Sequence, residues 1–330
     1  MARIGINPAR GKVSSYSPKR VTVAMLTYLP HLEGYFRSRF DVLKLSLASL
    51  FANTSLPYDL LVFDNGSCAP VVEYLTRLKS EGRINFLLLS GTNIGKIGAF
   101  RLLFGAAPGN VVAYADDDIF FYPGWLEAHL EILDAYPKVG MVSGSPVRDA
   151  ADRARSSLYR FIDENRVGLS VSQKRQIPDQ WEIDWAVSVG RDPQAYLEST
   201  LDQPDLILTY RGVEAFGSAS HFQFVAPKEV ILRAVPEEWS GKLMGDMIQL
   251  DEAVDGLGYL RLSTVERTTR HLGNTISPDV IEDARAVGRQ LDAIPAAGRP
   301  GKHWMVRLPG SRRLLTKIYD SLFRLLHNVD

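Results

Sequence analysis

The chain has 330 residues, of which 45% are hydrophobic and 23% charged, and its 38 basic residues balance its 38 acidic residues. This is the composition of a folded globular protein, and a formal net charge of zero gives the molecule as a whole no electrostatic preference for nucleic acid. The single cysteine, Cys68, excludes an intramolecular disulfide and a zinc site built from several cysteines. The sequence also lacks an apolar run of about 18 residues, the length that spans a bilayer.

Both ends of the chain are basic. Residues 1–20 contain no acidic residue, and the last thirty residues contain six Lys or Arg against two Asp. We predict that residues 1–19 form a flexible basic leader and that 295–330 form a linker followed by a basic amphipathic helix over 312–327. Docking on the parent domain and contact with an anionic membrane surface or another subunit are the two open roles for that helix.

Short apolar runs alternate with helical patterns through residues 21–143. The runs suit buried strands and the patterns suit helices that pack on one side. Such alternation is typical of an α/β fold with a mostly parallel sheet flanked by helices. The predicted strands are 21–27, 58–64, 84–89, 110–115 and 139–143, and the predicted helices are 40–51, 71–78, 95–107 and 125–136.

Residues 145–205 interrupt this rhythm, and we expect either an insertion or an irregular, partly mobile segment over the edge of the sheet. Regular structure is predicted to resume after it. Strands are expected over 206–210, 221–225 and 259–264, helices over 227–234 and 244–257, and a loop around His271.

Polar side chains follow four of the predicted strands at the point where each strand ends. Because the carboxyl ends of parallel strands lie at one edge of a sheet, these side chains should lie close together where ligands usually bind. The clusters are Thr27 with Tyr28, Asp64 with Asn65, residues 90–96, and Asp116 to Asp118.

The acid triplet Asp116, Asp117 and Asp118 directly follows an apolar run. Side chains alternate along an extended backbone, so Asp116 and Asp118 are expected to point the same way. Neighbouring carboxylates repel one another unless a cation lies among them, and a hard divalent metal is the simplest such cation. A solvated acidic turn is the alternative.

These residues and their order resemble the GT-A glycosyltransferases, in particular those of family 2. The resemblance runs over residues 21–274 and is weakest through 145–205. It implies a GT-A domain over 20–294, in which 20–143 bind the nucleotide and 144–294 bind the acceptor. The segments that support it are Thr27-Tyr28, Asp64-Asn-Gly-Ser67, Asn93-Ile-Gly-Lys-Ile-Gly-Ala99, Asp116-Asp-Asp118, Gly245-Asp246 and His271.

The resemblance implies a nucleotide-diphosphate sugar as donor. Asp64 would accept a hydrogen bond from uracil or guanine, and the alternative for Asp64 is a helix cap or Asx-turn. Lys96 and the small residues around it would place a cation and backbone N–H groups near the diphosphate, or the glycines serve close packing. The implied donor-binding residues are Thr27, Tyr28, Asp64, Asn93, Lys96, Asp116 and Asp117.

The match of Asp116 and Asp118 to the Asp-x-Asp motif implies a divalent metal. Asp118 would bind the metal, Asp116 the metal or the ribose, and His271 would be a further ligand. Imidazole beside carboxylates favours Mn²⁺ over Mg²⁺. Such a cation would neutralise the departing diphosphate as the glycosidic bond breaks. An exposed loop histidine is the alternative for His271.

Asp246 resembles the late acid that acts as general base in inverting members of the family, and Asp251 is the alternative base. A general base would deprotonate the acceptor hydroxyl as it attacks the anomeric carbon. Capping of a helix is the competing role for Asp246. Trp185 and His221 are expected to contact the acceptor, with core packing as the alternative.

Taken together, the resemblance implies a metal-dependent transferase that moves a sugar from UDP- or GDP-sugar to a saccharide or glycoconjugate acceptor, with inversion and with Mn²⁺ or Mg²⁺. A retaining transferase and a non-catalytic sugar-nucleotide-binding protein are the alternatives. We expect no nucleic-acid partner. We expect a cytoplasmic protein of polysaccharide or glycoconjugate synthesis, with peripheral contact at the inner membrane face as a further hypothesis.

Overall fold

The computed structural model describes residues 16–150, 153–237 and 247–287. The chain divides into two units, 1–294 and 295–330, and all described residues belong to the first. Most of the predicted leader, the predicted C-terminal helix and Asp246 lie outside the described residues. Within the described residues no helix is both long and apolar enough to cross a bilayer.

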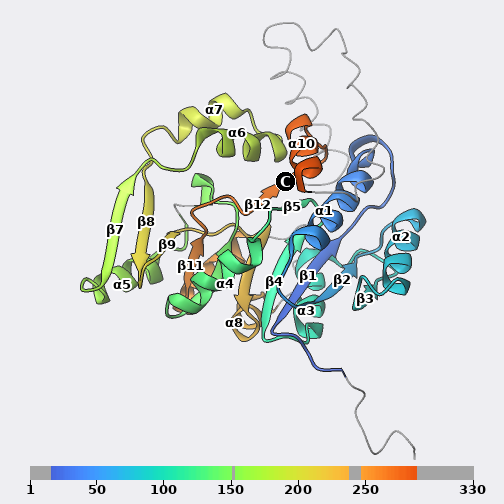
Figure 1. Ribbon diagram of the computed structural model, residues 1–330, viewed down its shortest axis with the longest axis horizontal. Helices are drawn as coiled ribbons and strands as arrows, with labels where there is room; N and C mark the ends of the chain where they lie inside the picture. Colours follow the sequence, from blue (N-terminus) through green and yellow to red (C-terminus); the bar gives the residue numbers. More distant parts are fainter. Residues whose placement is uncertain (1–15, 151–152, 238–246, 288–330) are drawn as a thin grey trace, which may run out of the picture. The chain divides into compact units, whose positions relative to one another are not determined.

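A ten-stranded mixed sheet forms the centre of the described part of the chain (Figure 1). Its order is β3-β2-β1-β4-β10-β6-β11-β9-β8-β7. Strands β3, β2, β1, β4, β6, β11 and β8 run in one direction and β10, β9 and β7 in the other. The predicted α/β fold with a mostly parallel sheet is confirmed. The strands are β1 (Val21–Thr27), β2 (Tyr58–Asp64), β3 (Phe86–Leu89), β4 (Val111–Asp116), β6 (Val139–Ser143), β7 (Leu169–Lys174), β8 (Asp205–Tyr210), β9 (Val213–Phe216), β10 (Gln223–Pro227) and β11 (Leu260–Ser263).

Helices cover both faces of the sheet. Val23 and Met25 of β1 pack in one core with residues of α1, α2 and α4, whereas Ala24 and Leu26 pack in a second core with residues of α3, α8 and α9. This follows because successive side chains of a strand point to opposite faces. The helices are α1 (Arg39–Asn53), α2 (Ala69–Ser80), α3 (Gly95–Ala106), α4 (Trp125–Ala135), α8 (Lys228–Ala234), α9 (Ile248–Gly256) and α10 (Pro278–Val287), with a short 3-10 turn at Gly34–Phe36.

The segment between β6 and β8 is more regular than predicted. It forms a 3-10 turn at Arg148–Ala150, α5 (Ser156–Glu164), strand β7, α6 (Asp179–Ser188) and α7 (Pro193–Ser199). Strand β7 pairs with β8 along all six of its residues. The prediction of an irregular segment was therefore wrong for the described residues, because this pairing depends on a distant strand and not on local apolar periodicity.

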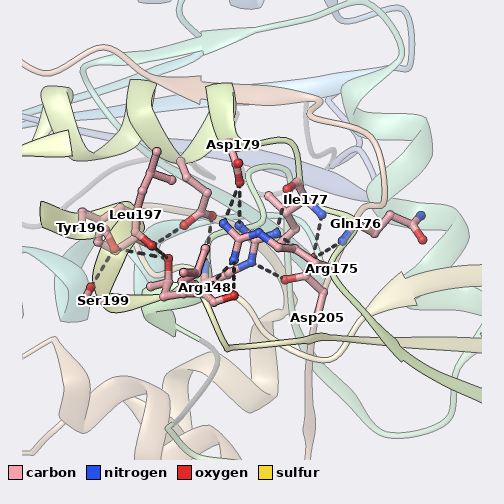
Figure 2. A network of polar contacts seen from close by, with 12 residues as sticks. Arg148, Arg175, Gln176, Ile177, Asp179, Tyr196, Leu197, Ser199 and Asp205 are labelled. Atoms are coloured by element: carbon pink, nitrogen blue, oxygen red, sulfur yellow. Dashed lines mark hydrogen bonds and ion pairs between the residues drawn. The ribbon is translucent and has the colours of Figure 1, made fainter. Parts of the chain in front are cut away.

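A buried ion pair anchors this segment to the sheet (Figure 2). Nε and Nη2 of Arg148 lie 2.8 and 2.9 Å from the two carboxylate oxygens of Asp205. Nη2 also donates to the carbonyl of Ile177 at 2.7 Å. Backbone N–H groups of Gln176 and Ile177 donate to Asp205 at 2.6 and 2.7 Å. The first residue of β8 is thus tied to the turn after β6 and to the loop before α6.

A second, two-stranded sheet joins β5 (Ile119–Phe121) to β12 (Thr269–His271). His271 pairs with Ile119, and the N–H of Leu272 donates to the carbonyl of Asp118 at 2.8 Å. The predicted loop around His271 was therefore wrong. This pairing places His271 beside the acid triplet despite their distance in sequence.

Candidate active site

The loops after β2 and β3 are joined by two asparagines. Nδ2 of Asn65 donates to Oδ1 of Asn93 at 2.9 Å, and Oδ1 of Asn65 accepts the N–H of Ile94 at 2.9 Å. Gly66 lies at φ +92°, and a Cβ there would be 2.9 Å from the carbonyl carbon of Thr92. Only glycine fits both this backbone conformation and this contact, so the two loops pack closely beside Asp64.

Asp64 is 1% exposed, and its two carboxylate oxygens have different surroundings. Oδ1 accepts the N–H groups of Gly66 and Ser67 at 3.2 and 3.0 Å, which is the Asx-turn that the sequence left open. Oδ2 is buried and has no hydrogen-bond partner among the described residues. A buried acceptor without a partner is unusual in a folded protein, and it fits an N–H group brought by a ligand.

Lys96 lies in the first turn of α3 and pairs with Asp116 at the end of β4. Its Nζ is 2.7 and 2.9 Å from the two carboxylate oxygens. The hydroxyl of Tyr114 also donates to Asp116. A cation is unfavourable at a helix N-terminus, so Asp116 offsets the repulsion between Lys96 and the helix dipole.

Arg39, the first residue of α1, lies between Asp117 and Asp118. Nη2 pairs with Asp117, and Nη1 is 2.6 Å from Oδ2 of Asp118 and 2.9 Å from the carbonyl of Gly273. Burial by itself lowers the pKa of Arg39, but the charges of Asp117 and Asp118 outweigh it and raise that pKa. Arg39 therefore stays charged and neutralises this end of the triplet.

The triplet does not converge on one point as predicted. Asp116 contacts Lys96, whereas Asp118 contacts Arg39, because β4 ends at Asp116 and the strand alternation stops there. The charges of the triplet are offset by Lys96 and Arg39, so the triplet does not require the predicted divalent metal for its neutralisation. Thr27 and Asp117 are buried, and the Thr27 hydroxyl donates to Asp117. Thr27 and Asp117, which were both predicted to bind the sugar donor, thus face each other in the interior at this edge of the sheet.

Asp118 and His271 form a separate pair. Nε2 of His271 is 3.4 Å from Oδ2 of Asp118, and Nδ1 is 2.7 Å from the hydroxyl of Ser188. That hydroxyl donates to the carbonyl of Trp185 at 2.7 Å, so it accepts a hydrogen bond from the Nδ1–H of His271. Nε2 therefore faces Asp118, and in the neutral imidazole it carries the lone pair that a cation at Asp118 would bind. Without a metal, an imidazolium at His271 can pair with Asp118 through Nε2. Burial acts to raise the pKa of Asp118, but the positive charges of such an imidazolium and of Arg39 outweigh it and lower the pKa.

The Asp118 and His271 pair fits one side of a divalent cation site. Oδ1 of Asp118 is buried and without a hydrogen-bond partner in the described part of the chain. Within residues 16–150, 153–237 and 247–287 no three His, Cys, Asp or Glu side chains converge on one metal position. Mg²⁺ in particular is often held by one or two protein groups together with substrate phosphates and water. Asp116, held by Lys96, is not part of this pair.

The remaining predicted residues lie around this edge. Tyr28 is half-buried, with its ring edge-on to Phe36 at 6.4 Å. Trp185 is buried in α6 and packs against Tyr196, with ring centroids 5.0 Å apart, so its position is that of a core residue. His221 precedes β10 and does not lie within a strand as predicted, because β10 begins at Gln223.

Residues 35–191 match the sequence model of glycosyl transferase family 2. We refer to this matching region, which is just under half of the chain, as the family 2 domain. The match includes Asp64, Lys96 and the acid triplet, and it ends before His221 and His271. The predicted family resemblance and GT-A fold are confirmed.

Individual relatives of this family 2 domain are distant. An uncharacterized glycosyltransferase of Nostoc sp. is 27% identical over 122 residues, which are 37% of this chain and 37% of that protein. A mannosyltransferase of Pyrobaculum calidifontis, solved with GDP-Man and Mn²⁺, is 15% identical with a TM-score of 0.42 over 78% of this chain and 58% of that chain. Residues 1–349 of S. aureus TarS are 12% identical, with a TM-score of 0.43 over 82% and 64%. The alignments thus span less than two thirds of each of these proteins.

Two residues of this site, Arg39 and Ser188, were not predicted from the sequence. Arg39 at the start of α1 had one signal, since a cation at a helix N-terminus needs a nearby anion. No feature of the sequence indicated Ser188, because its hydrogen bond with His271 depends on β12, which brings His271 to the end of α6.

Proposed function

We propose that this protein transfers a sugar from a nucleotide-diphosphate donor to an acceptor hydroxyl. The observation that best supports this is a pair of buried carboxylate oxygens, Oδ2 of Asp64 and Oδ1 of Asp118, that have no partner among the described residues. Asp64 is the last residue of β2, and Asp118 lies two residues after the end of β4, which runs parallel to β2 through β1. Oδ2 of Asp64 suits an N–H group of a nucleobase, and Oδ1 of Asp118 suits a cation bound to a diphosphate.

The base and ribose would lie beside Asp64. A carboxylate oxygen accepts from the ring N–H of uracil or guanine, which favours a UDP- or GDP-sugar over one built on adenine or cytosine. Asn93 is fixed by Asn65 at this position. Asp116 is partly accessible, with 22% of its side chain exposed, and is assigned here to the ribose.

The diphosphate would lie over the start of α3. Lys96 Nζ has three hydrogens, of which two point to Asp116, so one remains for a phosphate oxygen. Backbone N–H groups at the helix start add to the positive potential. Lys96 therefore provides a positive group near the leaving diphosphate.

Asp118 and His271 would hold a divalent cation, and one oxygen with one imidazole ligand favours Mn²⁺. When bound, the ion would neutralise charge on the leaving diphosphate. Ser188 orients His271 toward this position, and Arg39 restrains Asp118.

A single displacement with inversion fits this edge better than attack by an enzyme carboxylate. Asp116 is paired with Lys96, and Asp117 and Asp118 are paired with Arg39, so these three carboxylates are poor nucleophiles. Asp246 lies outside the described residues and stays a prediction as general base.

The proposal is tested by thermal unfolding of the full chain with UDP, GDP, ADP and CDP, each with and without Mn²⁺. A ligand that binds the folded state raises the melting temperature by mass action. We expect a shift with UDP or GDP that is larger with Mn²⁺. Asp64→Asn should reduce the shift. Asp59→Asn is the matched control, since Asp59 is also buried in β2 but is bound by Tyr16 and Lys19. No shift with any diphosphate would contradict the proposal.

A further inference from the structure

His221 and Asp251 form a pair that has no part in the proposed donor site. Nδ1 of His221 lies 3.1 Å from Oδ2 of Asp251. The side chain of His221 is 29% exposed, whereas that of Asp251 is 2% exposed. The imidazole is therefore reachable from solvent, and the carboxylate behind it is not.

Asp251 is held in place by a second contact. Nη2 of Arg261 lies 3.0 Å from Oδ1 of Asp251 and donates to the carbonyl of Ala219 at 2.6 Å. This buried guanidinium balances the charge of Asp251, so the carboxylate stays ionised and can accept a hydrogen bond from the Nδ1–H of His221. A neutral imidazole fixed in this way leaves the lone pair of Nε2 as an acceptor.

The pair lies at the same edge as the acid triplet. Gln223 of β10 pairs with Ala115 of β4, and the N–H of Asp116 donates to the carbonyl of Phe222 at 2.9 Å. The ring of Phe222 also packs against the ring of His271, with centroids 5.1 Å apart. His221 is therefore one residue from a segment that contacts both Asp116 and His271.

We infer that His221 is the catalytic residue that takes the proton of the attacking hydroxyl, and that Asp251 is its positioning residue. This inference rests on the proposed glycosyl transfer. The acceptor oxygen forms a bond to the anomeric carbon while the bond from that carbon to the β-phosphate oxygen breaks. The electron pair leaves with the nucleoside diphosphate, and the acceptor proton passes to Nε2 of His221. Asp251 holds the ring and stabilises the imidazolium, as a buried carboxylate does behind other catalytic histidines.

The sequence suggested Asp246 or Asp251 as the general base, whereas this inference gives that role to His221. Asp251 faces His221 and Arg261 and is too buried to reach an acceptor itself. Asp246 lies outside the described residues, and its replacement separates the two hypotheses. Under the inference, Asp246→Asn retains a larger fraction of activity than His221→Gln.

The experiment measures release of nucleoside diphosphate from UDP-glucose, UDP-N-acetylglucosamine and GDP-mannose by the full chain, with water and a set of monosaccharides as acceptors. Binding of UDP and GDP is followed in parallel by thermal unfolding. His221→Gln should lower kcat by about 100-fold or more with the nucleotide-induced shift unchanged. Asp251→Asn should lower kcat by at least about 10-fold. Imidazole added to His221→Gly should restore part of the rate.

Asp255→Asn is the matched control for Asp251→Asn. Asp255 is a second buried carboxylate of α9, where it accepts the backbone N–H groups of Ser156 and Ser157 at 3.0 and 2.8 Å. Its replacement should lower stability but leave kcat unchanged.

The inference is overturned if His221→Gln keeps its kcat, if imidazole gives no rescue, or if the loss is confined to nucleotide binding. The proposed function fails separately if the unaltered protein binds neither UDP nor GDP, or binds them without releasing diphosphate from any donor. The inference falls with it in that case.

Discussion

Nζ of Lys96 lies 2.7 and 2.9 Å from the two carboxylate oxygens of Asp116. The pair joins the start of α3 to the end of β4, so the cation and the partly exposed carboxylate lie together where a diphosphate and a ribose are proposed to bind. Pairing in the protein keeps Lys96 ordered before a ligand arrives, which reduces the entropy cost of binding.

Lys96→Met is expected to weaken binding of UDP or GDP by about 10-fold or more, because one charge-assisted hydrogen bond to the diphosphate is lost. Calorimetric titration measures this directly. Binding of uridine or guanosine, which have no phosphate, should change little. Equal affinity of Lys96→Met and the unaltered protein for the diphosphates would show that Lys96 serves only Asp116.

Arg39→Met is expected to destabilise the protein by about 3–5 kcal/mol, because it leaves Asp117 and Asp118 buried without their cation. Urea unfolding at pH 7 measures this. Added Mn²⁺ should stabilise Arg39→Met more than the unaltered protein, since a metal can then replace the guanidinium charge.

Arg20→Met is the control for that experiment. Arg20 pairs with Asp134 at the surface, where the two side chains are 49% and 55% exposed, so its loss should cost at most about 1 kcal/mol. If Arg39→Met and Arg20→Met are equally stable in urea, then Arg39 is not needed to stabilise the acid triplet.

Ser188→Ala is expected to weaken Mn²⁺ binding by about 10- to 100-fold in the presence of UDP or GDP, because His271 loses the group that fixes its tautomer. The manganese dependence of the thermal shift gives the measurement. Ser199→Ala is a matched control, since Ser199 also donates to a carbonyl three residues earlier but does not contact His271. If the thermal shift of both variants is half-maximal at the same Mn²⁺ concentration, Ser188 does not contribute to the metal site.

His129 is expected to make the fold sensitive to acid. It is fully buried on α4, and burial lowers its pKa from 6.5 to about 4. Between these values the unfolded chain binds a proton that the folded chain does not. The stability is therefore complete above pH 6.5 and falls by up to about 3 kcal/mol as the pH drops toward 4.

The measurement is the pH dependence of the unfolding free energy in urea. His129→Phe removes the titrating group, so its stability should fall less steeply over this range, even if it is lower at neutral pH. Parallel curves for His129→Phe and the unaltered protein would assign the acid sensitivity to other groups.

Long apolar runs made the first half of the sheet predictable. All seven residues of β1 are buried, which is typical of a parallel strand covered on both faces, and its predicted ends agree with the structure. The short strands β5 and β12 were not predictable in this way. Each has three residues and forms because the other is present, and they are far apart in sequence.

The polar strand ends were predictable as a group, but their pairings were not. Asp64 and Lys96 lie at strand and helix ends as expected from the sequence. The separation of Asp116 from Asp118 depends on where β4 stops and on Arg39, which comes from another helix. Similarly, His221 meets Asp251 only through packing of α9 near the start of β10.

The central claim is that Asp64 and Asp118 mark two ends of one donor site. Calorimetric titration of UDP, GDP, uridine and guanosine, with and without Mn²⁺, tests it most directly. Asp64→Asn should weaken binding of the preferred nucleoside and of its diphosphate alike, whereas Asp118→Asn should weaken only the Mn²⁺-dependent binding of the diphosphate. If both variants bind the diphosphate with Mn²⁺ as tightly as the unaltered protein does, the two carboxylates do not form a donor site.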